Sequence, residues 1–263
     1  MQFWCSASGK AWTWSWVAYP GVWLVVAVLA FTYHRLTRVA AEHNRHLITG
    51  WIGVVTVWLA LDWPLGPLAA GYLASAHALQ FLLVAFIAPP LLLLGARQGL
   101  TAWWSDGASR RLSGRAVALL TQPLMAAVLF NVVTITTHVP AVVDGSMPTQ
   151  VGAFAIDLFW LLGGIVFWWP MVVSVPERLL FGGGAKVLYL FLGTVFHTGI
   201  AIAMLMRDYP MYAVYELAPP MSGLSALDDI MVAGGIMELA GSAIIFGIMT
   251  VMFFRWSREA GNA

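Results

Sequence analysis

The chain alternates long apolar stretches with short polar ones, and the apolar stretches approach the length of bilayer-crossing helices. Such a helix needs about 20 apolar residues to cross roughly 30 Å of hydrocarbon. The pattern therefore predicts an all-α integral membrane bundle of seven transmembrane helices. The predicted spans are residues 15–33, 48–61, 73–94, 116–137, 151–173, 187–206 and 230–254.

Composition places nearly all of the chain in the membrane. Of the 263 residues, 60% are hydrophobic and 10% are charged, whereas an average soluble domain has about 25% charged residues. We therefore expect a single transmembrane domain over residues 1–263. The net charge of +1 and the lack of a basic tract argue against a nucleic-acid partner.

The positions of Lys and Arg predict how the bundle is oriented. Eleven of the 13 basic residues fall in four polar segments, which are residues 34–47, 95–115, 174–186 and 255–263. Cytoplasmic segments of membrane proteins carry an excess of Lys and Arg. We therefore expect the N-terminus outside and the C-terminus in the cytoplasm.

Polar residues inside the predicted spans are the candidate functional site, because such residues are costly in a bilayer and usually face the bundle interior. They are His77, Gln80, Asp157, His197 and Glu238, and His138 stands at the outer end of the fourth span. With the predicted orientation, all lie in or near the outer half of the membrane. Two interpretations stay open, an interhelical hydrogen-bond network and a functional pocket.

The residue types in this layer allow specific chemistry. Imidazole suits copper, so the candidate metal ligands are His77, His138, His197 and Asp157. A polar pocket or partner-docking site would use Gln80, Glu238, Asp228 and Asp229. An alternative is a membrane haem-binding electron carrier with His77 and His197 as axial ligands. No Walker, HExxH or GxSxG motif occurs, so no enzyme activity is expected.

Several strings resemble the CtaG family of cytochrome c oxidase assembly factors, which are multi-pass proteins linked to haem-copper oxidases of the caa3 type. The most specific is APPLLLLG at 88–95 after HALQ at 77–80, whereas LDWPLGP at 61–67 is a weak match alone. WWP at 168–170 and LDD at 227–229 also resemble the family. The resemblance implies an assembly factor or stably associated subunit in a bacterial plasma membrane, with oxidase subunits and lipid as partners. It leaves a role in copper insertion open.

The chain departs from the family pattern at two positions with metal-binding character. The family usually has a histidine directly after the glutamine of the third span, where this chain has Phe81. It also tends to have histidine in the outer half of the fifth span, where this chain offers Asp157 and Phe159. Two interpretations therefore stay open: the chain has lost a metal site, or it rebuilds one from His77, His138, Asp157 and His197.

Overall fold

The computed structural model of the protein describes residues 2–38, 46–105, 112–173, 182–221 and 223–261. Every regular element in these ranges is a helix, which confirms the all-α prediction. In chain order they are α1 Pro20–Thr37, α2 Leu47–Leu61, α3 Leu65–Gly71, α4 Ala74–Phe81, η2 Leu82–Ile87, α5 Ala88–Ser105, α6 Leu112–Leu120, α7 Pro123–Thr136, α8 Pro140–Ser146, α9 Gln150–Val172, α10 Gly183–Leu205, α11 Ala213–Glu216, α12 Ala226–Gly235, η5 Ile236–Ala240 and α13 Gly241–Gly261.

Several of these helices are long and apolar enough to cross a membrane. Within the described residues there are four such helices, Ala74–Trp104, Gln150–Val172, Gly184–Leu205 and Ala226–Arg258. The number rises to six if each bent pair is one span, namely Leu47–Leu61 with Leu65–Gly71 and Gly114–Leu120 with Pro123–Thr136. The first predicted span falls on α1, which is not among them, so seven spans stay a prediction.

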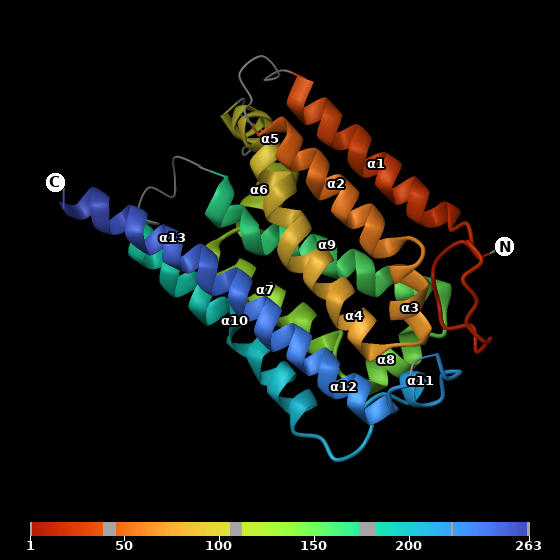
Figure 1. The fold of residues 1–263 in the computed structure, drawn as a ribbon. Coiled ribbons are helices and arrows are strands. Elements are labelled where there is room, and N and C mark those ends of the chain that lie inside the picture. Colours follow the sequence, from red (N-terminus) through yellow and green to blue (C-terminus); the bar gives the residue numbers. More distant parts are fainter. Residues whose placement is uncertain (1, 39–45, 106–111, 174–181, 222, 262–263) are drawn as a thin grey trace.

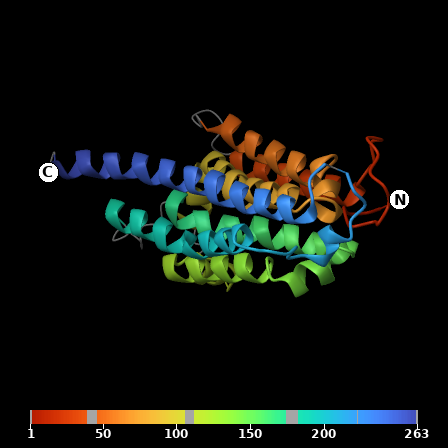
Figure 2. The same ribbon diagram turned by 60° about the horizontal axis from the view of Figure 1, so that its bottom comes forward.

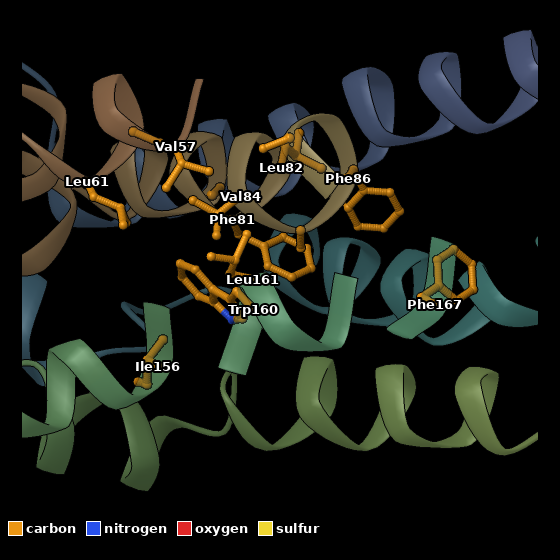
Figure 3. Packing of buried hydrophobic residues seen from close by; sticks show 14 of the residues in the cluster. Val57, Leu61, Phe81, Leu82, Val84, Phe86, Ile156, Trp160, Leu161 and Phe167 are labelled. Carbon is orange, nitrogen blue, oxygen red and sulfur yellow. The ribbon is translucent and has the colours of Figure 1, made fainter. Parts of the chain in front are cut away.

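The helices pack as neighbours across the bundle. Helix α1 lies on α2, α2 on α5, α5 on α9, α9 on α7, and α7 on α10, which also contacts α13. The two views show α10 and α13 side by side and place the N-terminal segment and the C-terminal helix at opposite ends of the bundle (Figures 1 and 2). The buried core runs between these helices, with large aromatic side chains such as Phe81, Trp160 and Phe167 (Figure 3).

Two of the long helices contain a π-helical turn near the candidate site. In the helix that begins at Ala74, this turn is η2, which ends at Ile87, two residues before Pro89. Proline lacks an N–H group and leaves carbonyls of the preceding turn without a helical partner, and π-helical turns are frequent at functional sites. A Cβ atom on Gly164 of α9 would lie 2.5 Å from the Ala85 carbonyl oxygen, so glycine there lets α9 approach η2 closely.

Some predicted boundaries were wrong for local reasons. Residues 62–72 lie between two predicted spans, but α3 begins at Leu65 because Pro67 is tolerated in the first turn of a helix. The fourth span is bent by 75° between Leu120 and Pro123, where the proline starts a new helix. Helix α5 continues to Ser105, beyond the predicted end at residue 94.

Four of the basic residues on which the predicted orientation rests lie outside the described residues. They are Arg45, Arg110, Arg111 and Arg178.

Candidate functional site

The candidate site lies near one end of the bundle, under a cover built from four separate segments of the chain. We call this cover the end cap and define it as residues 2–19, α3, α8 and α11, which gather at that end of the molecule (Figure 1). Its parts are joined by hydrogen bonds, such as those from the Ala7 amide to the Met147 carbonyl (2.9 Å) and from the Val214 amide to the Asp144 carboxylate (3.0 Å). The polar residues of α4 and α9 are therefore sealed from that end.

His77 and His138 are neighbouring buried imidazoles in this site. His77 lies on α4 and His138 follows the end of α7, and their ring centroids are 6.1 Å apart. Both side chains are at most 3% exposed. His138 Nδ1 is 2.7 Å from the Thr134 carbonyl, whereas His138 Nε2 and both His77 ring nitrogens have no hydrogen-bond partner among the described residues. Each neutral imidazole can thus offer one ring nitrogen with a free lone pair to a ligand.

Trp160 and Phe81 form the apolar wall around the two imidazoles. The Trp160 ring lies 4.8 Å from His77 and 6.0 Å from His138, and its Nε1 donates to Thr137 Oγ1 at 2.9 Å. Phe81 packs edge-on against Trp160 at 5.3 Å, as the close-up shows (Figure 3). It also contacts His138 at 4.8 Å and His197 at 5.9 Å. Phe81 therefore lies between His138 and His197.

Asp157 is buried and bound to the end cap. Its Oδ2 accepts a hydrogen bond of 2.8 Å from Nε1 of Trp4, a side chain that is 1% exposed. The neighbouring Cys5 donates its thiol to the Leu61 carbonyl at 3.3 Å, and burial raises the pKa of that thiol well above its ordinary value of 9.0. A protonated thiol is a poor metal ligand, because the thiolate is the form that binds. The hydrogen bonds from Trp4 to Asp157 and from Cys5 to Leu61 thus hold the N-terminal segment in place.

Gln80, Asp228 and Asp229 have identifiable structural partners. Gln80 Nε2 donates to the Ala60 carbonyl at 3.1 Å, near the end of α2. The buried Asp229 carboxylate accepts from the Ala74 amide at 2.6 Å and also from Ser75, so it caps the start of α4. Asp228 is exposed and accepts from Ser225 Oγ at 2.6 Å at the start of α12. Gln80 and Asp229 therefore stabilise the position of α4, which carries His77, whereas Asp228 contacts only the start of its own helix.

Tyr215 of α11 and Tyr212, the residue just before α11, close the site and were missed by the sequence analysis. Tyr212 donates its hydroxyl to the His138 carbonyl at 3.0 Å, and Tyr215 donates to the Ala69 carbonyl at 2.7 Å. The Tyr215 ring lies 5.8 Å from His77. Burial raises the pKa of both hydroxyls above the ordinary value of 10.0, so they stay protonated and donate. No local pattern marks these residues, because α11 has only four residues and lies in a predicted loop.

The predicted set of metal ligands does not gather in one place. His77 and His138 are neighbours, but Asp157 is bound to Trp4 and His197 lies on the far side of Phe81. In the described part of the chain, no group of three or more His, Cys, Asp or Glu side chains is placed to hold one metal ion. The residues present fit at most an ion shared by the two imidazoles, and copper binding stays a prediction.

His197 and Glu238 open onto a separate cavity. They line a groove of about 240 Å³ between α10 and the helix formed by η5 and α13. His197 is 2% exposed, and neither its Nε2 nor Glu238 Oε2 has a hydrogen-bond partner among the described atoms. The polar layer predicted from the sequence is therefore divided into two sites, the His77–His138 pair and this groove.

The structure and its polar interior define a helical membrane protein with an enclosed pair of histidines beneath a folded end cap. Comparison with protein families assigns the particular family. Residues 27–259 match the model described as cytochrome c oxidase caa3 assembly factor (Caa3_CtaG), and the chain belongs to this family. The match confirms the resemblance seen in the sequence. No curated protein and no solved structure matches the chain.

Proposed function

We propose that this protein assembles a haem-copper cytochrome c oxidase in the plasma membrane of a bacterium, or remains bound to it as an accessory subunit. The role is non-catalytic. The family match over residues 27–259, which reaches from α1 to α13, carries this proposal. Affinity purification from the native membrane tests it. Oxidase subunits in the eluate are expected, and their absence both from mature membranes and during oxidase synthesis would contradict the proposal.

The same experiment separates the two forms of the proposal. A stably associated subunit would co-purify with the mature oxidase in fixed stoichiometry. A transient factor would be found only with incompletely assembled oxidase subunits. Both forms agree with the exposed apolar side chains on α1, such as Leu24, Val28 and Phe31, which are 57–64% exposed and face lipid or a partner helix.

In the proposed topology the chain crosses the membrane seven times, with the N-terminus outside and the C-terminus in the cytoplasm. An odd number of spans is supported by the positions of the two chain ends at opposite ends of the bundle (Figure 1). Labelling with a membrane-impermeant maleimide tests the orientation, in a Cys5→Ser background. Cysteines at the exposed Ser8 and Leu217 should react from outside, and one at the exposed Arg258 only after lysis. The reverse pattern would contradict the orientation.

We further propose that the His77–His138 pair carries copper during assembly. Three unpartnered buried ring nitrogens support this, since such groups are costly unless they gain a partner. Copper analysis of the purified protein should show bound metal that is lost in His77→Ala and His138→Ala. The exposed His34→Ala variant is the matched control and should keep it. Equal copper in all four proteins, or none in any, would contradict this assignment.

The haem alternative has a simple test of its own. A haem held by His77 and His197 would give a Soret band that either alanine variant abolishes. The packing favours the copper assignment, because the Phe81 ring occupies the space beside His197 at a centroid distance of 5.9 Å.

A further inference from the structure

The groove between α10 and α13 has the features of a ligand site. It measures about 240 Å³ and is lined by residues of both helices. Hydroxyl and apolar side chains alternate along it, including Thr194, Thr198 and Phe191 from α10 and Ser242 and Phe246 from α13. Small-molecule pockets share this composition of apolar walls with a few polar groups, although their usual volume is roughly 300–1,000 Å³. This groove would therefore hold only part of a larger molecule.

The floor of the groove is polar and incompletely hydrogen-bonded. Glu238 Oε1 accepts from Ser242 Oγ at 3.1 Å, but Glu238 Oε2 and His197 Nε2 have no partner in the part of the chain that the structure describes. A Cβ atom on Gly241 would lie 2.4 Å from His197 Cε1, so glycine there makes room for the imidazole. Leaving such groups without partners at membrane depth is costly, and a bound ligand would remove that cost.

The groove opens sideways toward the lipid. Its rim residues Phe191, Val195 and Phe246 are 51%, 47% and 56% exposed. His197 lies eight residues before the end of α10 at Leu205, and Glu238 lies 12 residues after the start of α12 at Ala226. At 1.5 Å per residue, the polar floor is about 12–18 Å below the helix ends. A ligand would therefore enter from the bilayer.

We propose that this groove binds the head of a membrane-soluble isoprenoid quinone, with the tail left in the lipid. Phe191 and Phe246 line the groove and supply aromatic faces for a flat ring, and His197 and Glu238 each have one unpartnered polar atom that could pair with a ring oxygen. A Glu238 carboxylate accepts from a hydroquinone hydroxyl, and a protonated carboxyl donates to a quinone carbonyl. His197 Nε2 donates to a quinone carbonyl when it carries the ring proton, and accepts from a hydroquinone hydroxyl when Nδ1 carries it. A phospholipid headgroup fits poorly, because it would bring a phosphate to a carboxyl group far below the interface.

This site is independent of the proposed copper pair and of the oxidase. Phe81 and Phe86 lie against His197 at 5.9 and 5.1 Å, and Phe81 separates its ring from the His138 ring. Loss of a ligand from the groove would therefore leave copper at His77 and His138 unchanged. Conversely, alanine at His77 would leave the groove unchanged.

Photolabelling of the full chain in phospholipid nanodiscs tests the proposal. The probe is an azido-benzoquinone with a decyl tail, and the labelled peptides are mapped by mass spectrometry. Labels are expected within residues 191–198 or 238–249, and an excess of unlabelled decyl-benzoquinone should remove them. Decanol should not compete. Labels spread over other lipid-facing helices, or competition by decanol, would show only a nonspecific apolar surface and overturn the proposal.

Two variants sharpen this test. Thr194→Trp fills the groove, and Leu192→Trp adds the same bulk at a side chain that is 55% exposed and is not among the groove residues. Labelling should fall at least about tenfold in the first and stay unchanged in the second. Glu238→Gln keeps the shape and should weaken competition about tenfold, the equivalent of 1.4 kcal/mol. If Thr194→Trp labels like the wild type and Glu238→Gln is competed like the wild type, both in monodisperse preparations, the proposal is wrong.

Discussion

The Phe81 ring packs edge-on against the His138 imidazole, with ring centroids 4.8 Å apart. Because Phe81 is fully buried and also contacts His197, its side chain keeps three histidines from forming one polar cluster. Position 81 therefore decides whether this interior can hold a metal ion with more than two imidazoles. The first prediction concerns this position.

Phe81→His should create a stronger metal site at the cost of stability. Without metal, the buried imidazole lacks the packing of phenylalanine, and we expect a loss of about 2–3 kcal/mol. Cu(I) should raise the melting temperature of this variant more than that of the wild type, because a ligand that binds the folded state stabilises it. Phe81→Leu is the control. It should lose stability, and Cu(I) should not raise its melting temperature above the effect seen in the wild type. Equal copper response in both variants would refute the role given to this position.

Asp229 should be far more important for stability than its neighbour Asp228. Asp229→Ala leaves the buried amide of Ala74 without its acceptor, and we expect a loss of about 2 kcal/mol or more in thermal or denaturant unfolding in detergent. Asp228→Ala removes an exposed carboxylate, and Ser225 Oγ still caps α12, so the change should stay within about 0.5 kcal/mol. Equal effects would contradict the capping role of Asp229.

The stability of the protein should depend on pH through His138, which follows the end of α7. Burial lowers the pKa of His138 from its ordinary 6.5 to about 4. Between these values the unfolded chain binds more protons than the folded one, so stability falls as the pH is lowered from 6.5 to 4. The loss approaches about 3 kcal/mol at the lower end.

The matched variant for this pH dependence is His138→Gln, which keeps a polar side chain at the position but cannot titrate. His77 lies 6.1 Å from His138 and is present in both proteins, so the difference between their unfolding curves reports His138. Parallel pH profiles for the wild type and His138→Gln would contradict the prediction.

The hydrogen bond between Trp4 and Asp157 should hold the end cap on the bundle. Trp4→Phe keeps the ring but leaves Asp157 Oδ2 without this donor, which should cost about 1–3 kcal/mol. The N-terminal segment should then be cleaved faster in limited proteolysis. Trp16→Phe changes a side chain that is 60% exposed and should leave the cleavage rate unchanged. Unchanged cleavage of Trp4→Phe would show that other contacts hold the segment.

The bounds of long apolar helices could be predicted from the sequence, whereas contacts between distant residues could not. Helix α9 was predicted within one residue at each end, because apolar length is a local property. The partner of Asp157 was not predicted, because Trp4 stands 153 residues away and meets it only through the fold of the end cap. The sequence analysis placed His77, His138 and His197 in one layer, but the separation of His197 from His138 by Phe81 depends on side-chain packing that no local pattern reveals.

Deletion of the gene and complementation test the central claim most directly. The quantity to measure is the amount of assembled haem-copper oxidase in membranes, from reduced-minus-oxidised spectra and cytochrome c oxidase activity. We predict that the deletion strain loses most of the oxidase and that the wild-type chain restores it. His77→Ala should restore little, whereas His34→Ala should restore it fully. A deletion strain with normal amounts of active oxidase would contradict the proposed function.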